Sequence, residues 1–297
     1  MNVLVLSHLA DSPGTRITMQ LFAQAGCTVR QARPDDLHLT LFAAPGSAAT
    51  IDASPLSPRP DLVYPRLGSS APPRALDVLR HLEAMGLPVV NRAASLEIAR
   101  DKFRTYLALA AAGVPVPSTV LVGPDAPLDP AIEALGPPPW IVKLPVGTKG
   151  AAVTIADTPR ALRSLLDLVA SLDQRVLVQR FVAEAAGTDV RVMVIDGVAR
   201  LAVRRRAVGD EFRSNIYLGG EDSPESLSPE VAAVAEAATA AVGLDVAGVD
   251  ILEGADGPVV AEVNGSPGLT GPHGRYPEEI AAIFAGLVAA RSAGGLS

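Results

Sequence analysis

The feature that most constrains the fold is a hairpin pattern at residues 246–264, toward the end of the chain. Two apolar runs flank Gly254-Ala255-Asp256-Gly257, whose glycines permit the positive φ angles of a tight turn. A turn centred near this aspartate would pair Asp250 with Glu262 across the ladder. Because side chains alternate between the faces of a strand, Asn264 would share the face of Glu262. Three apolar neighbours would face a core instead: Val249, Ile251 and Val263.

Such a hairpin would project two carboxylates and one amide from a single face. Adjacent anionic oxygens repel one another unless a cation lies among them. Hard oxygen ligands suit Mg²⁺ or Mn²⁺, which keep open positions for phosphate oxygens. One interpretation is therefore a metal site formed by Asp250, Glu262 and Asn264. For this pattern in isolation, the alternative is an ordinary hairpin with one solvated face.

The composition indicates a folded protein without a global attraction to polyanions. The chain has 297 residues, 48% hydrophobic and 19% charged, which is enough for a substantial core in two or three lobes. A net charge of −7 argues against nucleic acid or an anionic membrane as a partner. The longest uncharged stretch, residues 105–124, is interrupted by glycine and proline and does not read as a membrane span. We expect a soluble, cytoplasmic α/β protein, because the start of the chain reads as a strand rather than a signal peptide.

The first 95 residues alternate between strand and helix patterns. Such alternation predicts a small open parallel sheet, with ligand-binding loops at the carboxyl ends of its strands. Arg66 follows one of these strand ends, where it would reach a carboxylate or simply be solvated. No G-x-G-x-x-G follows the first strand, so a dinucleotide site is not indicated. Residues 43–60 read as a surface loop. The expected strands are 2–6, 28–32 and 61–65, and the expected helix is 15–25.

Lysines mark two segments of the following stretch. Lys143 lies within the apolar run at 140–144, where a buried ammonium needs an anionic partner. The loop that follows, residues 147–152, offers glycines and backbone N–H groups, and the two together form a phosphate-gripping arrangement. It is not a P-loop, since that spacing is absent. Upstream, a helix expected over residues 95–112 contains Arg100-Asp101-Lys102, which alone would be a solvated helix face.

Arginines concentrate after a second buried strand. Residues 176–182 form an apolar run that favours a connector between two lobes. A strand expected at 201–203 ends in Arg204-Arg205-Arg206, and residues 209–215 follow with further charged and amide side chains. Three successive arginines usually mean solvent exposure, but here they lead into a concentrated positive, amide-bearing face.

The motifs in this order resemble the ATP-grasp superfamily, and specifically the RimK-type amino-acid ligases, which add glutamate to the C-terminus of a ribosomal protein. The resemblance extends over about residues 90–270. It rests on Arg100-Asp101-Lys102, Val142-Lys143-Leu144, Gly147-Thr148-Lys149-Gly150, Asp189-Val190-Arg191, Glu211-Phe212-Arg213-Ser214-Asn215, Ala247-Gly248-Val249-Asp250-Ile251-Leu252 and Glu262-Val263-Asn264-Gly265-Ser266-Pro267-Gly268-Leu269.

This resemblance implies a mixed α/β (α+β) ATP-grasp fold, in which two lobes sandwich ATP behind a small parallel-sheet N-terminal domain. The expected domains are residues 1–95, 96–182 with the phosphate-gripping loop, and 183–297 with the metal site. The implied chemistry begins when a carboxylate attacks the γ-phosphate of ATP to give an acyl phosphate and ADP. An amine then displaces the phosphate to form an amide, which requires charge neutralisation and alignment rather than a protein nucleophile.

The resemblance also assigns roles to individual residues. Asp250, Glu262 and Asn264 would hold two Mg²⁺ (or Mn²⁺) that bridge the β- and γ-phosphates. The backbone of residues 179–182 would face adenine, and Asp189 the ribose. The full set of expected nucleotide-binding residues is Lys102, Lys143, Gly147, Thr148, Lys149, Gly150, Gln179, Arg180, Phe181, Val182, Asp189, Arg213, Ser214 and Asn215.

Permanently charged guanidinium groups would stabilise the acyl phosphate and the oxyanion. The expected catalytic residues are Arg213 together with Arg204 or Arg205. One departure from the family pattern is Arg180-Phe181, where an acidic–aromatic pair is usual. Backbone contacts with adenine survive this change, whereas a side-chain contact at position 180 is in question.

Several functions remain open at this stage. The leading hypothesis is a carboxylate–amine ligase that adds glutamate to a protein or peptide C-terminus. An alternative in the same superfamily acts on a small metabolite or carrier protein, as in lysine biosynthesis, cofactor glutamylation or glutathione-like chemistry. A non-catalytic ATP-binding module is a third possibility, although it would not need the paired carboxylates. The expected partners are an amino-acid donor, a protein, peptide or small carboxylate acceptor and, by family resemblance, further copies of the chain.

Overall fold

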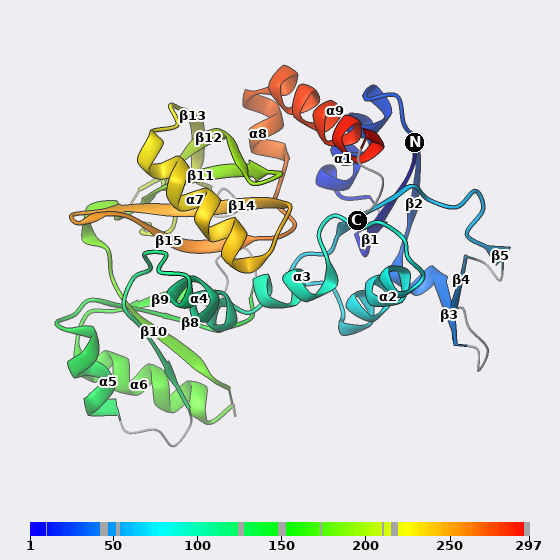
Figure 1. Cartoon of the computed structure of the whole chain (residues 1–297). Coiled ribbons are helices and arrows are strands. Elements are labelled where there is room, and N and C mark those ends of the chain that lie inside the picture. The colour runs from blue at the N-terminus through cyan, green and yellow to red at the C-terminus, as the bar shows by residue number, and fades with distance from the viewer. Residues whose placement is uncertain are drawn as a thin grey trace.

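The structure, a computed structural model, describes residues 1–9, 11–41, 47–51, 54–123, 128–147, 153–172, 174–209, 211–214 and 219–293. Within these residues the chain forms one parallel and one small antiparallel sheet near its start, and two larger antiparallel sheets after them. Figure 1 shows the two larger antiparallel sheets lying one above the other, with the parallel N-terminal sheet beside them. No helix in the described ranges is long and apolar enough to cross a membrane.

The N-terminal sheet is the small parallel sheet that the sequence predicts. Its strand order is β2-β1-β6. Ser7 and Arg66 pair with each other at the carboxyl ends of β1 and β6. The Arg66 guanidinium also donates to the Pro267 carbonyl at 2.6 Å. The strands are β1 (Asn2–Ser7), β2 (Thr28–Ala32) and β6 (Leu62–Arg66), with helices α1 (Pro13–Gln24) and α2 (Pro73–Ala84) and the 3₁₀ turn η1 (Pro34–Asp36).

The loop expected at residues 43–60 is wrong for residues 47–51 and 54–55, which form strands, whereas residues 56–60 lie in a loop as expected. A second, antiparallel sheet lies here, with strands β3 (Leu37–Leu41), β4 (Ser47–Ile51) and β5 (Ser54–Pro55). Only the last two residues of Ser-Ala-Ala-Thr-Ile favour a strand, and the whole segment pairs with β3.

The second lobe is built on an antiparallel sheet of order β7-β10-β8-β9. Trp140 is fully buried beneath it, against Leu162 and Val178 in one cluster. The elements are β7 (Thr119–Val122), α5 (Leu128–Leu135), β8 (Trp140–Lys143), β9 (Val153–Ala156), α6 (Pro159–Ala170) and β10 (Val176–Arg180).

The single helix expected over residues 95–112 is two helices, α3 (Ala93–Ala99) and α4 (Lys102–Ala111). Asp101 breaks the run, because its carboxylate accepts hydrogen bonds from the Phe103 and Arg104 N–H groups and caps α4. The triplet that would have been a solvated face is therefore a helix start. This places Lys102 at the first position of α4, between the two antiparallel sheets.

The last lobe carries a five-stranded sheet of order β13-β12-β11-β14-β15. Helix α7 covers one of its faces (Figure 1) and begins at the Ser228 cap with proline at its first position. The arginine run lies inside β12 rather than beyond a shorter strand. The elements are η2 (Ala183–Ala185), β11 (Thr188–Ile195), β12 (Val198–Arg206), β13 (Glu221–Glu225), α7 (Pro229–Val242), β14 (Val246–Gly254), β15 (Gly257–Asn264), α8 (Thr270–Arg275) and α9 (Pro277–Ala293).

The last helix packs on the first lobe. The rings of Phe22 in α1 and Phe284 in α9 meet edge to face with centroids 5.2 Å apart, and Tyr64 of β6 lies within 6 Å of both, at 5.1 and 5.9 Å. Figure 1 shows α9 lying beside α1. A single apolar cluster thus joins the N-terminal sheet to the C-terminal lobe.

Candidate active site

The hairpin of β14 and β15 brings the predicted metal-binding residues onto neighbouring positions. Asp250 pairs with Glu262, and Gly248 pairs with Asn264, which agrees with the sequence-based expectation. The expected core residues on the other face are fully buried, with exposed fractions of 1% or less: Val249, Ile251 and Val263.

The hairpin reaches this pairing by a different route from the expected one. Gly254 pairs with Gly257, so the turn holds two residues and is centred half a residue earlier than predicted. If this register continued along the hairpin, Asp250 would pair with Ala261 instead of Glu262. Ile251 pairs with Val260, and Ala261 is the extra residue of a β-bulge that restores the alignment.

Asp250 is held by two arginines, one on the neighbouring strand β11 and one on β12 beyond it. Arg191 donates through Nε and Nη2 to its two carboxylate oxygens at 2.6 and 2.7 Å, and Arg205 Nη2 lies 2.8 Å from Oδ2. Burial alone would raise the pKa of Asp250, but the two guanidinium groups outweigh it and hold this pKa below its ordinary value. The sequence suggested that an external cation must relieve the repulsion between the hairpin carboxylates. Arg191 and Arg205 already offset part of that repulsion at Asp250.

Asp189 completes this buried cluster. Arg205 also donates two hydrogen bonds to the Asp189 carboxylate, one of them at 2.6 Å. The Ser214 hydroxyl donates to the same carboxylate at 2.7 Å. Burial would lower the pKa of Arg205, but its two carboxylate partners raise it, so the guanidinium remains charged. The predicted ribose contact of Asp189 remains a prediction, and its carboxylate is already engaged by these partners.

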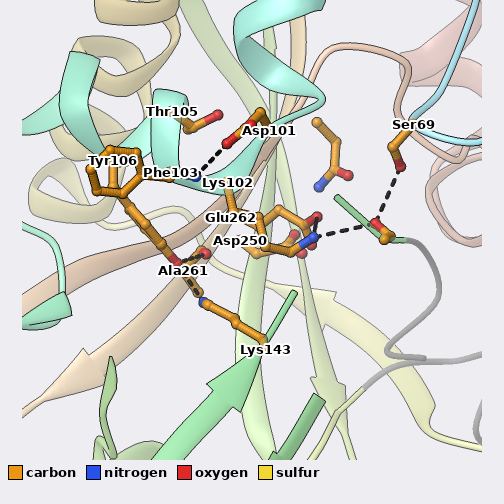
Figure 2. A network of polar contacts seen from close by, with 12 residues as sticks. Ser69, Asp101, Lys102, Phe103, Thr105, Tyr106, Lys143, Asp250, Ala261 and Glu262 are labelled. Carbon is orange, nitrogen blue, oxygen red and sulfur yellow. Dashed lines mark hydrogen bonds and ion pairs between the residues drawn. The ribbon is translucent and has the colours of Figure 1, made fainter. Parts of the chain in front are cut away.

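Glu262 is more accessible and faces a lysine. Lys102 Nζ lies 3.6 Å from Glu262 Oε1 and donates to the Gly147 carbonyl at 3.2 Å. The Ser69 hydroxyl of the N-terminal lobe donates to the same carbonyl at 3.2 Å. Figure 2 shows this lysine between the hairpin carboxylates and the start of the loop that follows β8.

These residues fit a hard divalent cation. Within the described ranges no group of three or more His, Cys, Asp and Glu side chains gathers, so the ligands available here are two carboxylates and an amide. Asn264 donates its Nδ2–H to the Gly248 carbonyl at 3.3 Å. The amide nitrogen is thus engaged, and the amide oxygen is the atom that would bind a metal. Carboxylate and amide oxygens are the donors that Mg²⁺ prefers.

Lys143 is buried, with 7% of the residue exposed, and its partners are not the anions that the sequence suggested. Within the described residues it donates to the Tyr106 hydroxyl at 2.7 Å and to Gln179 Oε1 at 2.9 Å, both neutral. A buried ammonium with neutral partners still favours an anion nearby. Because Lys143 lines the cleft between the sheets, that anion can be a phosphate from solvent.

The two candidate arginines of β12 lie on opposite faces of its sheet. Arg205 lines the cleft. Arg204 instead donates to Glu225 at 2.5 Å and to Glu253 at 2.6 Å, and both carboxylates lie away from the cleft. Of the two alternatives left open by the sequence, Arg205 has the placement that a catalytic role needs.

Arg213 lies at the rim of the cleft, where Glu211 fixes it. Its Nε and Nη2 donate to the Glu211 carboxylate at 2.9 and 2.7 Å, and Nη1 donates to the Val153 carbonyl at 3.2 Å. These hydrogen bonds lower the pKa of Glu211 to about 2. Arg180 ends β10 with an exposed side chain, so a polar contact at this position would be made at the surface of the cleft.

One cleft collects most of the predicted residues, while four of them lie outside the described ranges. Those outside are Thr148, Lys149, Gly150 and Asn215. The predicted residues that line the cleft are Lys102, Lys143, Gly147, Gln179, Arg180, Phe181, Val182, Asp189, Arg205, Arg213, Ser214, Asp250 and Glu262.

Sequence reasoning missed three residues that shape this site. Arg191 was quoted only as part of a motif, although its two-residue spacing from Asp189 places both side chains on one face of β11. Tyr106 and Asn91 gave no local signal, since each acts through contacts with a strand more than 150 residues away.

Two antiparallel sheets that enclose lysines, arginines and paired carboxylates define an ATP-grasp ligase, a class that uses ATP with Mg²⁺. Solved structures agree on the fold. The chain is similar to the ATP-grasp ligase PsnB complexed with a minimal precursor, at 24% identity and a TM-score of 0.74, covering 97% of this chain and 98% of that one. It is also similar to a RimK domain protein ATP-grasp from Sphaerobacter thermophilus, at 23% identity and a TM-score of 0.72 over 96% and 98%.

The family is shown by sequence. The model of the RimK-like ATP-grasp domain matches residues 99–284, and the chain belongs to this family of ATP-dependent ligases. It is 43% identical to a probable alpha-L-glutamate ligase of Thioalkalivibrio sulfidiphilus over 71% of this chain and 70% of that one. It is 36% identical to a probable alpha-L-glutamate ligase of Legionella pneumophila over 90% and 89%.

Proposed function

We propose that the protein adds L-glutamate to the C-terminus of a protein or peptide acceptor by way of an acyl phosphate. The observation that carries this proposal is the cleft itself, where the Asp250–Glu262 pair lies beside Lys102 and Lys143. The names of the glutamate ligase relatives support the amino acid. PsnB, which has the same fold, was solved in complex with a minimal precursor, and a peptide acceptor is consistent with that.

In the first step, an acceptor carboxylate oxygen attacks the γ-phosphorus of ATP, and the bond from phosphorus to the β-bridging oxygen breaks to release ADP. Lys102 and Lys143 neutralise phosphate oxygens and align them with the attacking carboxylate. Asp250, Glu262 and Asn264 would hold two Mg²⁺ (or Mn²⁺), which supply charge neutralisation on the β- and γ-phosphates.

In the second step, the glutamate amine attacks the acyl carbon through a tetrahedral intermediate, and phosphate leaves with the former carboxylate oxygen. The amine proton passes to the phosphate or to solvent. Arg205 and Arg213 place positive charge where the oxyanion develops, and a guanidinium fits this task because it is planar and always charged.

The test is ADP release from Mg-ATP by the purified full chain, screened over twenty amino acids with a pool of peptides that have free C-termini. Glu262→Gln is the preferred inactive variant, since its side chain is about one-third exposed, whereas Asp250 is the buried partner of two arginines. Glu253→Gln is the matched control, because Glu253 lies on the same hairpin but pairs with Arg204 outside the cleft.

The proposal expects ADP release that depends on glutamate and on peptide, disappears in Glu262→Gln and persists in Glu253→Gln. Mass spectrometry of the peptides should then find an added glutamate at the C-terminus. Release that depends on glutamate and a small carboxylate, but not on a peptide, would replace the proposed acceptor with a metabolite. Binding of ATP with no release under any condition would support a non-catalytic module instead.

A further inference from the structure

A chain of hydrogen bonds with a determined direction fixes the buried lysine of β8. The Thr119 hydroxyl donates to the Pro117 carbonyl at 2.7 Å, so its oxygen accepts from Gln179 Nε2 at 2.8 Å. This turns Gln179 Oε1 toward Lys143, which donates to it at 2.9 Å. Lys143 also donates to the Tyr106 hydroxyl oxygen at 2.7 Å. The lysine is therefore held from two sides by neutral acceptors.

The Tyr106 hydroxyl proton is directed at the hairpin of β14 and β15, which carries the proposed metal ligands. Its hydroxyl donates to the Ala261 carbonyl at 2.5 Å, and Figure 2 shows the tyrosine between that carbonyl and Lys143. Ala261 is the extra residue of the β-bulge, which has no partner position in β14. Because the bulge aligns Glu262 with Asp250, the tyrosine contacts the backbone where the spacing of the two carboxylates is set.

We infer that Tyr106 is a positioning residue for nucleotide binding. One hydroxyl group joins Lys143 of the central lobe to the bulge that precedes Glu262 in the C-terminal lobe. It thereby fixes the distance between the group that neutralises phosphate and the group that binds the metal, so that Mg-ATP meets both at once. The inference rests on the proposed roles of Lys143 and Glu262 in binding Mg-ATP.

The hydroxyl group of Tyr106, rather than its ring, makes the contacts that position Lys143 and the bulge. Tyr106 is 4% exposed and Lys143 is 7% exposed, so water does not readily replace the lost bonds. A phenylalanine would keep the ring in the core and leave a buried ammonium hydrogen and a partly buried carbonyl without this partner. The lysine would then relax toward other acceptors, and the bulge would lose an anchor.

The test compares Tyr106→Phe with Tyr276→Phe by calorimetric titration with Mg-AMPPNP, a non-hydrolysable ATP analogue. Tyr276 is a matched control, because its hydroxyl also bonds a strand carbonyl, Ala202 at 3.0 Å, but does not line the cleft. Tyr106→Phe should raise the Kd for Mg-AMPPNP about tenfold, which corresponds to about 1.4 kcal/mol. Tyr276→Phe should change it less than twofold. In turnover, KM for ATP should rise while KM for glutamate stays unchanged.

A double-variant cycle tests whether the tyrosine acts through the lysine. Lys143→Met removes the ammonium while keeping an apolar side chain of similar length. If Tyr106 acts through Lys143, adding Tyr106→Phe to Lys143→Met should weaken binding much less than tenfold. An equal tenfold loss in both backgrounds would overturn the inference. This arm also removes the unpartnered ammonium, so it remains informative if the single variant folds poorly.

The outcomes separate this inference from the proposed function. If the unmodified chain binds Mg-AMPPNP and Tyr106→Phe binds it equally well, the positioning role fails and the ligase proposal stands. If Tyr106→Phe lowers only the melting temperature and leaves the Kd unchanged, the tyrosine is a structural residue and the inference is again wrong. If the unmodified chain does not bind Mg-AMPPNP, the proposed function fails first.

Discussion

Replacing Asn91 by alanine tests how the hairpin is anchored. The Asn91 side chain is 98% buried and uses its donors and acceptors on four backbone groups. Its Nδ2 donates to the carbonyls of Val246 at 2.7 Å and Gly265 at 2.8 Å. Its Oδ1 accepts from the N–H groups of Asp245 at 2.7 Å and Val246 at 2.8 Å. One side chain thus clamps the beginning of β14 to the residue that follows β15.

The cost of Asn91→Ala follows from these four bonds. A net contribution of about 1 kcal/mol for each hydrogen bond gives a loss of about 4 kcal/mol in the free energy of unfolding. A typical total of roughly 5–15 kcal/mol makes this a large fraction of the stability. With an unfolding entropy of about 2.1 cal/mol/K per residue over 297 residues, about 4 kcal/mol corresponds to a melting temperature lower by roughly 6 °C.

The assay is thermal and urea unfolding followed by circular dichroism, with Asn2→Ala as the control. Asn2 is a partly exposed asparagine at the start of β1, whose backbone N–H rather than its side chain bonds Asp61. The control should change stability by less than about 0.5 kcal/mol. A loss below about 1 kcal/mol in Asn91→Ala would show that water or a backbone shift replaces the clamp, and would refute this reasoning.

Three further changes have expected outcomes. Asp250→Asn removes a buried carboxylate shared by the buried Arg205 and the partly buried Arg191, so the free energy of unfolding should fall by roughly 3–5 kcal/mol in a urea titration, and an unchanged midpoint would contradict this. Glu211 should titrate near pH 2 in a carboxyl NMR titration, since its hydrogen bonds with Arg213 lower its pKa from 4.5 to about 2. The stability from that pair is complete above pH 4.5 and is lost as the pH falls toward 2, and Arg213→Met should return the pKa toward 4.5. Gly265→Ala would place a Cβ 2.7 Å from Leu96 Cδ2 and should lower the unfolding free energy by about 1–3 kcal/mol, whereas wild-type stability would show that the leucine yields.

The sequence could predict the pairing of Asp250 with Glu262, but not how it arises. Alternation and a glycine-rich turn are local signals, and they place both carboxylates on one face. The bulge at Ala261 is not local, because Tyr106 from α4 contacts its carbonyl and Pro115 accepts from the neighbouring Val260 N–H at 2.9 Å. Those contacts exist only once the lobes are packed, so no window of the sequence shows them.

The same limit explains the other differences. The helix expected over residues 95–112 has a continuous helical pattern, but Asp101 caps a new helix within it because its side chain competes for backbone N–H groups. The arginines of β12 are adjacent in sequence, so composition cannot say which of Arg204 and Arg205 faces the cleft. Strand alternation could have separated them once the strand was known to continue through both.

The aromatic contact among Phe22, Tyr64 and Phe284 has a consequence for dissecting the molecule. The N-terminal sheet is completed by a helix from the opposite end of the sequence, so a fragment cut near residue 95 would expose the faces that α9 covers. Such a fragment would expose an apolar surface that is prone to aggregation, and it would not fold independently. Conversely, a tag or fusion that disturbs α9 would disturb the packing of Phe22 and Tyr64, far along the chain from the point of attachment.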